Sequence, residues 1–133
     1  AFDNKVLGSA ENLPFEDNSF DNVFCSFVWR NVSDTNNALN EVYRVLRPGG
    51  KFVLLDMTRP KNSFLRMLHK IGTFKVLHLI GLITFNLKEY RFLYKSLDFY
   101  PQPEEHLNKD NFIDLKIERM GVFNFVYLAV FTK

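Results

Sequence analysis

The sequence has one cysteine, no long apolar run and no excess of charge of either sign. The lone Cys25 excludes an internal disulfide, and its place in an apolar run favours a buried thiol over a nucleophile. The uncharged stretch from Val76 to Leu87 is much shorter than the ~20 residues that a membrane-spanning helix needs. Because 17 basic and 15 acidic residues are scattered along the chain, no nucleic-acid partner is expected.

Common catalytic and binding motifs are also missing. We find no Ser/His/Asp set and no glycine-rich phosphate loop, and we predict no metal site. His69, His78 and His106 lack metal-ligand spacing and are interpreted as ordinary surface or helix histidines. The sequence Pro48–Gly50 follows a predicted helix, which indicates a turn. The chain begins without methionine, a few residues before an apparent strand at 5–7, so we expect its start to be missing.

The composition is that of one soluble globular domain. With 133 residues, of which 47% are hydrophobic and 24% charged, the chain can bury a sizeable core. The 15 phenylalanines fit such a core, and a wide apolar ligand groove is the alternative. No internal repeat or linker is visible, so residues 1–133 are predicted to belong to a single domain.

Apolar periodicity in the first half predicts an α/β architecture. After the short strand at 5–7, a β-rich run at 20–28 ends almost continuously apolar, which is typical of a central strand covered on both faces. A helix capped by Ser33 or Asp34 follows, and a second strand lies at 51–55. Strand, helix and strand form a right-handed βαβ unit with a parallel pair.

The second half is predicted to be helical first and then β. Helical patterns cover residues 60–87 and 88–99, and Pro103 opens a short helix. Residues 113–118 alternate between apolar and charged, and an apolar strand follows at 125–131 after a turn. These two strands are expected to form an antiparallel hairpin.

The polar residues at the end of the run 20–28 are the first candidates for a site. In open parallel sheets ligands bind beyond the carboxyl ends of the strands, which here are followed by the loops at 8–12, 26–31 and 56–59. Arg30 either has a catalytic role at this tip or pairs with an acidic neighbour such as Glu41.

A series of motifs resembles the ubiquinone/menaquinone biosynthesis C-methyltransferase family. The patterns LPFxDxxFD and RVLxPGG occur throughout class I S-adenosylmethionine-dependent methyltransferases. The motifs RNV at 30–32 and YRFL at 90–93 with Ser96 narrow the resemblance to the quinone group. The resemblance runs from about Lys5 to the C-terminus and is weakest after Pro101. The motifs are SAENLPF at 9–15, DNSFD at 17–21, RNV at 30–32, YRVLRPGG at 43–50, LLDMTRP at 54–60 and YRFL at 90–93 with Ser96.

The resemblance implies the C-terminal part of a Rossmann-like class I methyltransferase fold. This part would be a mostly parallel sheet with a C-terminal antiparallel strand, lacking the first two strands, with a helical cap over roughly residues 60–100. Family members carry a glycine-rich loop and an acidic residue that hold S-adenosylmethionine ahead of the region matching Ala1. We therefore expect this chain alone to be inactive, with the strand at 20–28 presenting an unpaired edge that the N-terminal half, a second copy or a partner must cover.

The resemblance also implies roles for individual residues. Ser9 and Ala10 match positions that contact the adenine of the cofactor, and Ser26 matches a further cofactor-contacting position. Arg30 and Asn31 match residues that act on the quinol ring. Because a guanidinium is always charged, Arg30 would stabilise a developing phenolate rather than act as a base, while Asn31 would orient the ring oxygen.

Tyr90 and Tyr94 would line the substrate side. The implied activity is C-methylation of the ring of a ubiquinone or menaquinone precursor, a polyprenyl quinol-like small molecule. A methyltransferase for another acceptor and a non-catalytic interaction module are the alternatives.

The helical stretch from Phe64 to Leu87 has two interpretations. One is a core-facing helix pair and the other is a cap that accepts a polyprenyl tail or rests on a bilayer surface; we expect a mixture of both, with core packing contributing more. The expected location is cytoplasmic, with peripheral membrane contact allowed, on the matrix side of mitochondria if the source is eukaryotic.

Overall fold

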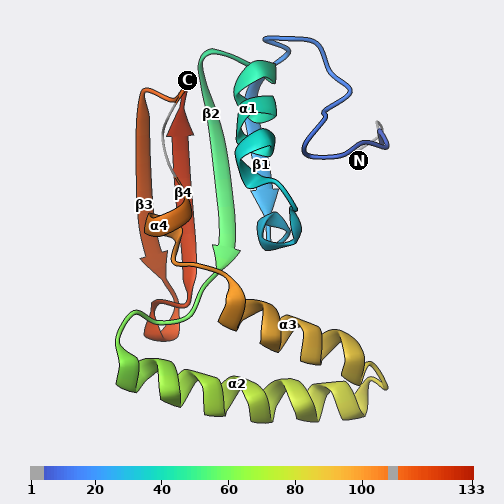
Figure 1. The fold of residues 1–133 in the computed structure, drawn as a ribbon, viewed down its shortest axis with the longest axis vertical. Coiled ribbons are helices and arrows are strands. Elements are labelled where there is room, and N and C mark those ends of the chain that lie inside the picture. The colour runs from blue at the N-terminus through green and yellow to red at the C-terminus, as the bar shows by residue number, and fades with distance from the viewer. Residues whose placement is uncertain (1–4, 108–110) are drawn as a thin grey trace.

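The fold is a mixed four-stranded sheet with helices on one face and a helical hairpin at one end (Figure 1). It is taken from a computed structural model that describes residues 5–107 and 111–133. The strand order is β1-β2-β4-β3. β1 (Phe20–Ser26) pairs in parallel with β2 (Leu46–Met57), and β4 (Val126–Thr132) runs antiparallel to both β2 and β3 (Asp114–Met120). Three strands therefore share one direction and the C-terminal strand opposes them, as predicted.

The predicted βαβ unit is confirmed, and its helix is α1 (Thr35–Val45). The Asp34 side chain accepts the Asn37 N–H at 3.0 Å and caps the helix. β2 begins directly after α1, so the predicted turn at 48–50 is an irregular stretch inside the strand, where the pairing with β1 shifts register. Gly49 has a φ of +80° there, a conformation that glycine adopts without steric cost.

The hydrophobic core lies between α1, the sheet and the segment around Phe112. The Phe52 ring stacks on Phe131 at 5.5 Å between centroids, and the buried Trp29 ring lies 5.5 Å from Phe52. These aromatic side chains account for much of the apolar surface that folding removes from water. The buried core members are Trp29, Ala38, Leu39, Val42, Leu46, Phe52, Leu54, Leu107, Phe112, Tyr127, Ala129 and Phe131.

β1 lies at the edge of the sheet, so the predicted central strand is wrong for this chain. Among the described residues its only strand partner is β2, and the Phe24 side chain is 74% exposed. The unpaired edge expected from the resemblance is thus present in the described part of the chain. The predicted strand at 5–7 is also wrong, because Lys5 to Leu7 are exposed and no described strand lies beside them to supply hydrogen bonds.

The predicted helices between residues 60 and 107 are confirmed as α2 (Ser63–Ile83), α3 (Leu87–Phe99) and α4 (Pro103–His106). α2 and α3 form an antiparallel hairpin across the end of the sheet at which β2 finishes (Figure 1). The expectation that the helical stretch from Phe64 to Leu87 mainly packs in the core was wrong. Within α2 only His69 and Gly81 are buried, and most of its apolar side chains are exposed, among them Phe64, Met67, Ile71, Phe74, Val76, Leu79 and Leu82.

The described helices are not of a kind that crosses a membrane. In the ranges 5–107 and 111–133, no helix combines the length and apolar character needed to cross a bilayer.

The irregular stretch of β2 makes a stability prediction. A Cβ at Gly50 would lie 2.8 Å from the Arg47 carbonyl oxygen and 2.9 Å from the Asp21 carbonyl oxygen, two backbone atoms that cannot swing away. Gly50→Ala should therefore lower the free energy of unfolding by about 1–3 kcal/mol, measured by urea denaturation. Gly72→Ala in α2 meets nothing within 4 Å and should instead raise it by up to about 1 kcal/mol. Equal effects of the two substitutions would contradict this account.

Candidate functional site

The chain leaves β1 through a strained turn that presents Arg30 and Asn31. Phe27 has a φ of +57°, which is unfavourable for a bulky side chain, and its N–H donates to the Leu55 carbonyl oxygen at 2.8 Å. One turn of 3-10 helix, η1 (Trp29–Asn31), follows. Because the buried Trp29 side chain anchors this turn in the core, Arg30 and Asn31 have fixed positions at the carboxyl end of β1.

The Arg30 side chain is buried against Asp56, near the adjacent end of β2. Arg30 Nη1 donates to Asp56 Oδ1, and the Arg30 backbone N–H donates to Oδ2 at 3.2 Å. The Met57 N–H also donates to Oδ1, at 2.7 Å. The Asp56 side chain is 0% exposed and that of Arg30 is 7% exposed. Asp56 thus holds the guanidinium in one orientation.

An acidic partner was one of the two alternatives for Arg30, with Glu41 as the example, and the partner in the structure is Asp56. Glu41 instead accepts hydrogen bonds from Arg44 Nε and from the Leu13 N–H, each at 2.8 Å. The hydrogen bond from Arg44 is the main cause that lowers the pKa of Glu41 to about 2. The available signal for Asp56 was its place at the predicted end of the neighbouring parallel strand, because the carboxyl ends of parallel strands lie at the same edge of the sheet.

The loop that carries Ser9 and Ala10 is held at the start of α1. Ser9 Oγ donates to Glu11 Oε2 at 3.0 Å, and Glu11 Oε1 accepts the N–H groups of Ser33 at 3.0 Å and Asp34 at 2.9 Å. The hydrogen bond from the Asp34 N–H is the largest cause of the lowered pKa of Glu11. Ala10 packs against the edge of the core. The loop is therefore fixed beside the residues that follow η1.

The predicted substrate residues lie apart from this group, between the two long helices. Tyr90 and Tyr94 line a cavity of about 140 Å³ between α2 and α3. The Tyr94 ring meets Phe74 edge-on at 5.6 Å, and the Arg59 guanidinium lies 4.8 Å from its centre. These contacts explain Tyr94 as part of the hairpin packing, and the role of both tyrosines toward a substrate stays a prediction.

Two of the other predicted residues are exposed where a ligand could reach them. Ser26 is the last residue of β1, and the Asn31 side chain points from η1 toward solvent. Ser26 and Asn31 therefore flank the turn at the carboxyl end of β1, and the loop with Ser9 is tied through Glu11 to Ser33 and Asp34, which follow that turn.

A second buried arginine, which sequence reasoning missed, fixes the hairpin to the end of β2. Arg59 is 3% exposed. Its Nε donates to Asp98 Oδ1 at 2.9 Å, its Nη1 to Thr73 Oγ1 at 2.8 Å and its Nη2 to the Tyr94 carbonyl oxygen at 3.2 Å. Arg59, three positions after Asp56, thus ties both α2 and α3 to the sheet.

In the described part of the chain no three His, Cys, Asp or Glu side chains gather as a metal site.

Comparison with known proteins gives consistent results for sequence and fold. The profile of the ubiE/COQ5 methyltransferase family matches residues 4–121. Over 101 residues the chain is 46% identical to the ubiquinone/menaquinone biosynthesis C-methyltransferase UbiE of Rickettsia bellii. It is 40% identical to the mitochondrial 2-methoxy-6-polyprenyl-1,4-benzoquinol methylase of Bos taurus. The alignments cover 75% of this chain but only 41% and 31% of these relatives.

The fold is similar to that of an S-adenosylmethionine-dependent methyltransferase from Thermotoga maritima, with a TM-score of 0.62. The match covers 95% of this chain and 62% of that protein, at 22% sequence identity. At this identity the similarity concerns the fold alone, and it confirms the predicted fold class.

The buried ion pair predicts a large effect of one neutral substitution. Asp56→Asn leaves the Arg30 guanidinium buried without a counter-charge and should lower the free energy of unfolding by about 3–5 kcal/mol, measured by urea denaturation. The double variant Arg30→Met with Asp56→Leu removes both charges and should be more stable than Asp56→Asn. The control Asp21→Asn affects an exposed carboxylate, 2.9 Å from Arg47, and should cost at most about 1 kcal/mol. Equal losses for Asp56→Asn and Asp21→Asn would contradict a structural role of the pair.

The hydrogen-bonded Glu41 predicts a specific pH dependence. Its pKa is lowered to about 2 in the folded chain, below the usual glutamate value of about 4.3 in an unfolded chain. Its stabilising contribution is therefore complete above that unfolded value and is lost as the pH falls toward 2. In Glu41→Gln the decrease in stability between pH 5 and pH 2 should be smaller than in the wild type. A decrease of the same size would remove Glu41 as a contributor.

Proposed function

The chain belongs to the ubiE/COQ5 methyltransferase family, and from this premise we propose that it forms the acceptor side of an S-adenosylmethionine-dependent C-methyltransferase. The proposed acceptor is the ring of a quinol or related phenol with a polyprenyl tail. The observation that carries this proposal is Arg30, buried against Asp56 where the parallel strands β1 and β2 end. The names of the relatives, a quinone-biosynthesis C-methyltransferase and a polyprenyl-benzoquinol methylase, support the substrate class.

Arg30 is suited to stabilise negative charge on a ring oxygen. Methylation of a ring carbon is favoured when the neighbouring hydroxyl develops phenolate character, and fixed donors at the ring oxygen lower the energy of that state. Arg30 is held by Asp56, while its Nε has no hydrogen-bond partner among the described residues. Because Asp56 partly neutralises the guanidinium, the contribution comes from directed N–H groups more than from net charge. The exposed Asn31 amide would orient the same oxygen.

The small residues at the end of β1 fit one side of an adenosyl group. Ser9 and Ser26 are exposed, and their short side chains let a ligand approach the backbone, while Ala10 offers an apolar contact. When bound, S-adenosylmethionine would supply the methyl group as an activated sulfonium. We propose that these residues form one wall of the cofactor site and that residues 1–133 alone do not retain the cofactor, because the sequence has no glycine-rich loop and the β1 edge is open.

The open edge also supports an assembly role. The N-terminal half, a second copy of this chain or another protein would extend the sheet beyond β1. If such a partner binds and no methyl transfer follows, the alternative of a non-catalytic interaction module is favoured.

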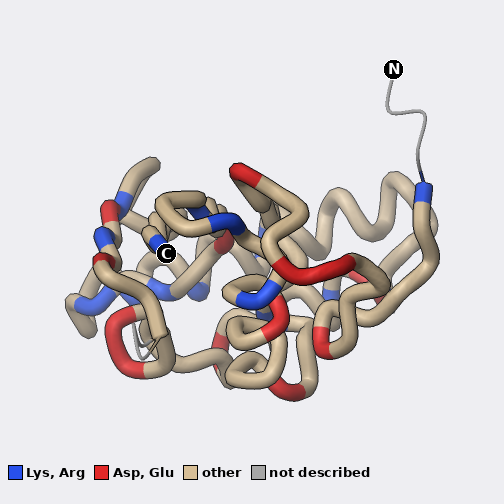
Figure 2. The backbone as a smooth tube through the Cα atoms, turned by 90° about the horizontal axis from the view of Figure 1, so that it is seen from above, with Lys and Arg blue, Asp and Glu red and all other residues tan. Residues whose placement is uncertain are grey.

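The hairpin of α2 and α3 supports contact with a polyprenyl tail or with a bilayer surface. Between residues 61 and 99 there are seven Lys or Arg and two Asp or Glu, next to the exposed apolar side chains of α2. Figure 2 shows basic and acidic residues distributed along the whole of the described backbone. An apolar cavity of about 300 Å³ lies where α2 and α3 meet Met57 and Phe123. We propose that this surface receives the tail and touches an anionic membrane from the cytoplasmic or matrix side.

The proposal is tested in a chimera. The part of the Rickettsia bellii relative that precedes its match is fused ahead of residue 5, and transfer of labelled methyl from S-adenosylmethionine to a demethylated polyprenyl quinol is measured. Arg30→Ala should lower turnover about 10²- to 10³-fold, as expected for loss of one charge-stabilising donor. Lys116→Ala on the exposed face of β3 is the control and should leave turnover unchanged.

Three outcomes would revise the proposal. Unchanged turnover in Arg30→Ala would remove Arg30 from the mechanism. Methylation of another phenol but not of the quinol would favour a different acceptor. Micromolar binding of S-adenosylmethionine to the 133-residue chain alone, measured by calorimetry, would overturn the one-wall proposal.

A further inference from the structure

Several buried polar atoms without partners lie near the Asp56 end of β2. Each has no hydrogen-bond partner within the ranges 5–107 and 111–133. Several belong to direct neighbours of Asp56: Arg30 pairs with it, Thr58 follows two residues later, and Tyr127 is its register partner on β4. The atoms are Trp29 Nε1, Arg30 Nε, Thr58 Oγ1, Tyr100 OH, His106 Nε2 and Tyr127 OH.

Such a concentration of unpaired groups indicates bound water. An unsatisfied buried donor or acceptor costs about 1–3 kcal/mol, and native proteins satisfy such groups with ordered water where the surroundings are polar. The Asp56 charge reaches Tyr100, Tyr127 and His106, because it shifts the pKa of each of them. The Arg30–Asp56 pair and His106 therefore belong to one cluster of buried polar groups.

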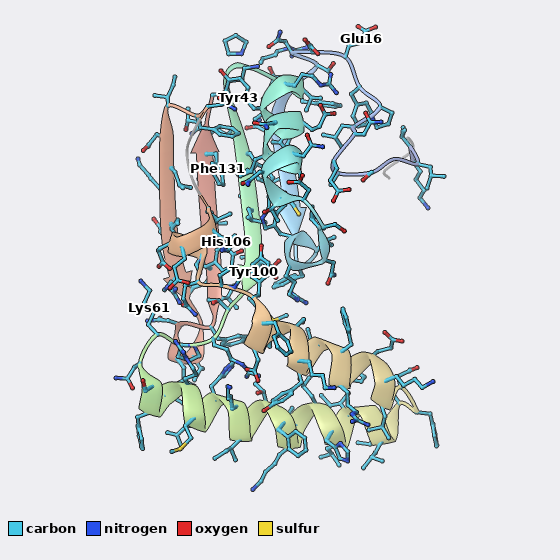
Figure 3. The ribbon with its side chains drawn as sticks, viewed as in Figure 1. Glu16, Tyr43, Lys61, Tyr100, His106 and Phe131 are labelled. Atoms are coloured by element: carbon cyan, nitrogen blue, oxygen red, sulfur yellow. The ribbon has the colours of Figure 1, made fainter. Side chains whose placement is uncertain are left out.

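His106 is held with a free lone pair toward this cluster. Its Nδ1 lies 2.8 Å from the Gln102 carbonyl oxygen, and since a carbonyl only accepts, Nδ1 carries the hydrogen. In the neutral ring Nε2 is then unprotonated, and it is this buried atom that has no partner in the described chain. Figure 3 shows Tyr100 and His106 side by side near the end of β2, with ring centroids 4.6 Å apart.

The other groups of the cluster are poor final proton acceptors. Asp56 already accepts three hydrogen bonds, from Arg30 twice and from Met57. The guanidinium of Arg30 is always protonated. Tyr100 and Tyr127 can pass a proton through their hydroxyls, but burial raises the pKa of both, so neither keeps a negative charge.

The remaining titratable groups near the cluster are Cys25, which affects Tyr100 and Tyr127, and Glu104 and Glu105, which affect His106. Burial raises the pKa of the Cys25 thiol, which therefore stays protonated. Burial is also the largest influence on His106 and lowers its pKa, against the opposing charges of Asp56, Glu105 and Glu104. His106 is thus neutral near pH 7 and has one unused basic nitrogen.

We propose that His106 Nε2 accepts, through ordered water lined by Asp56, Tyr100 and Tyr127, the proton that a ring substrate releases beside Arg30. The inference rests on the proposed function for the source of that proton. The ring hydroxyl O–H bond breaks and its proton passes to Nε2, while the ring carbon forms its bond to the methyl group and the electron pair of the broken methyl–sulfur bond stays on sulfur. The ring carbon then loses its own proton and the hydroxyl is restored. One proton per turnover remains and leaves from His106 to solvent.

The first experiment examines His106 without any methyl transfer. In the 133-residue chain with ¹⁵N-labelled histidine, nuclear magnetic resonance at pH 7 should show a hydrogen on Nδ1 and none on Nε2 of His106. Tyr127→Phe, which keeps the ring and its packing, should weaken the magnetisation transfer from water to the protons around His106. A hydrogen on Nε2, or transfer from water unchanged in Tyr127→Phe, would overturn the relay.

The second experiment uses the chimera and its pH profile. His106→Gln keeps a polar side chain but no base, so kcat should fall about 10²-fold or more, with KM unchanged. The acid limb of the wild-type profile should disappear in this variant. Lys116→Ala should keep the wild-type profile. A rise in KM alone, or an unchanged acid limb in His106→Gln, would show a merely structural role and overturn the proposal.

The two experiments separate this inference from the proposed function. If the wild-type chimera transfers no methyl group while His106 has the expected protonation, the proposed function fails, and the proposed relay then has no source of its proton. If transfer is normal and His106→Gln has no effect, the proposed function stands and the relay fails.

Discussion

The ion pair between Arg30 and Asp56 is the interaction on which the site depends. It joins the ends of the only parallel strand pair in the described chain, and both charges are almost completely removed from water. Such a pair is a weak source of net stability, because desolvation offsets much of the attraction. Its consequence is geometric: the turn after β1 can take only the position in which Arg30 meets the Asp56 carboxylate. The strained Phe27 is tolerated because this pair and the buried Trp29 determine the path of the turn together.

The helical hairpin depends on a second buried cation in the same way. Leu97 is the one buried apolar side chain of the described α2 and α3, and the His69 ring packs 5.1 Å from Phe125, so apolar packing makes only a small part of the attachment of the hairpin to the sheet. Arg59 supplies that attachment through hydrogen bonds to Thr73, Asp98 and the Tyr94 carbonyl. The hairpin is therefore anchored at one end, while most of its apolar surface stays exposed. An arrangement of this kind suits a surface that receives an apolar ligand.

The sequence predicted which helices and strands form more accurately than which residues lie next to them in space. Periodicity identified β1, α1, the three later helices and the final hairpin, since each pattern reflects local geometry. Periodicity placed β1 at the centre of a sheet, because the same apolar run is found in a strand covered on both faces and in an edge strand with no neighbouring strand on one side. It named Glu41 as the alternative partner of Arg30 because the true partner, Asp56, is 26 residues away in sequence and is brought close only by the parallel pairing. The role of His106 was also beyond sequence reasoning, since it depends on which ring nitrogen faces a carbonyl.

Several features that local rules disfavour lie near one end of the sheet. They are the positive φ of Phe27, the buried pair of charges, the six polar atoms without described partners and the exposed apolar face of α2. The rest of the sheet has a capped helix, an alternating hairpin and a stacked aromatic core. Natural proteins depart from local consistency mainly where function requires it. The carboxyl ends of β1 and β2 would therefore be the preferred position for a ligand even if no relative of this chain were known.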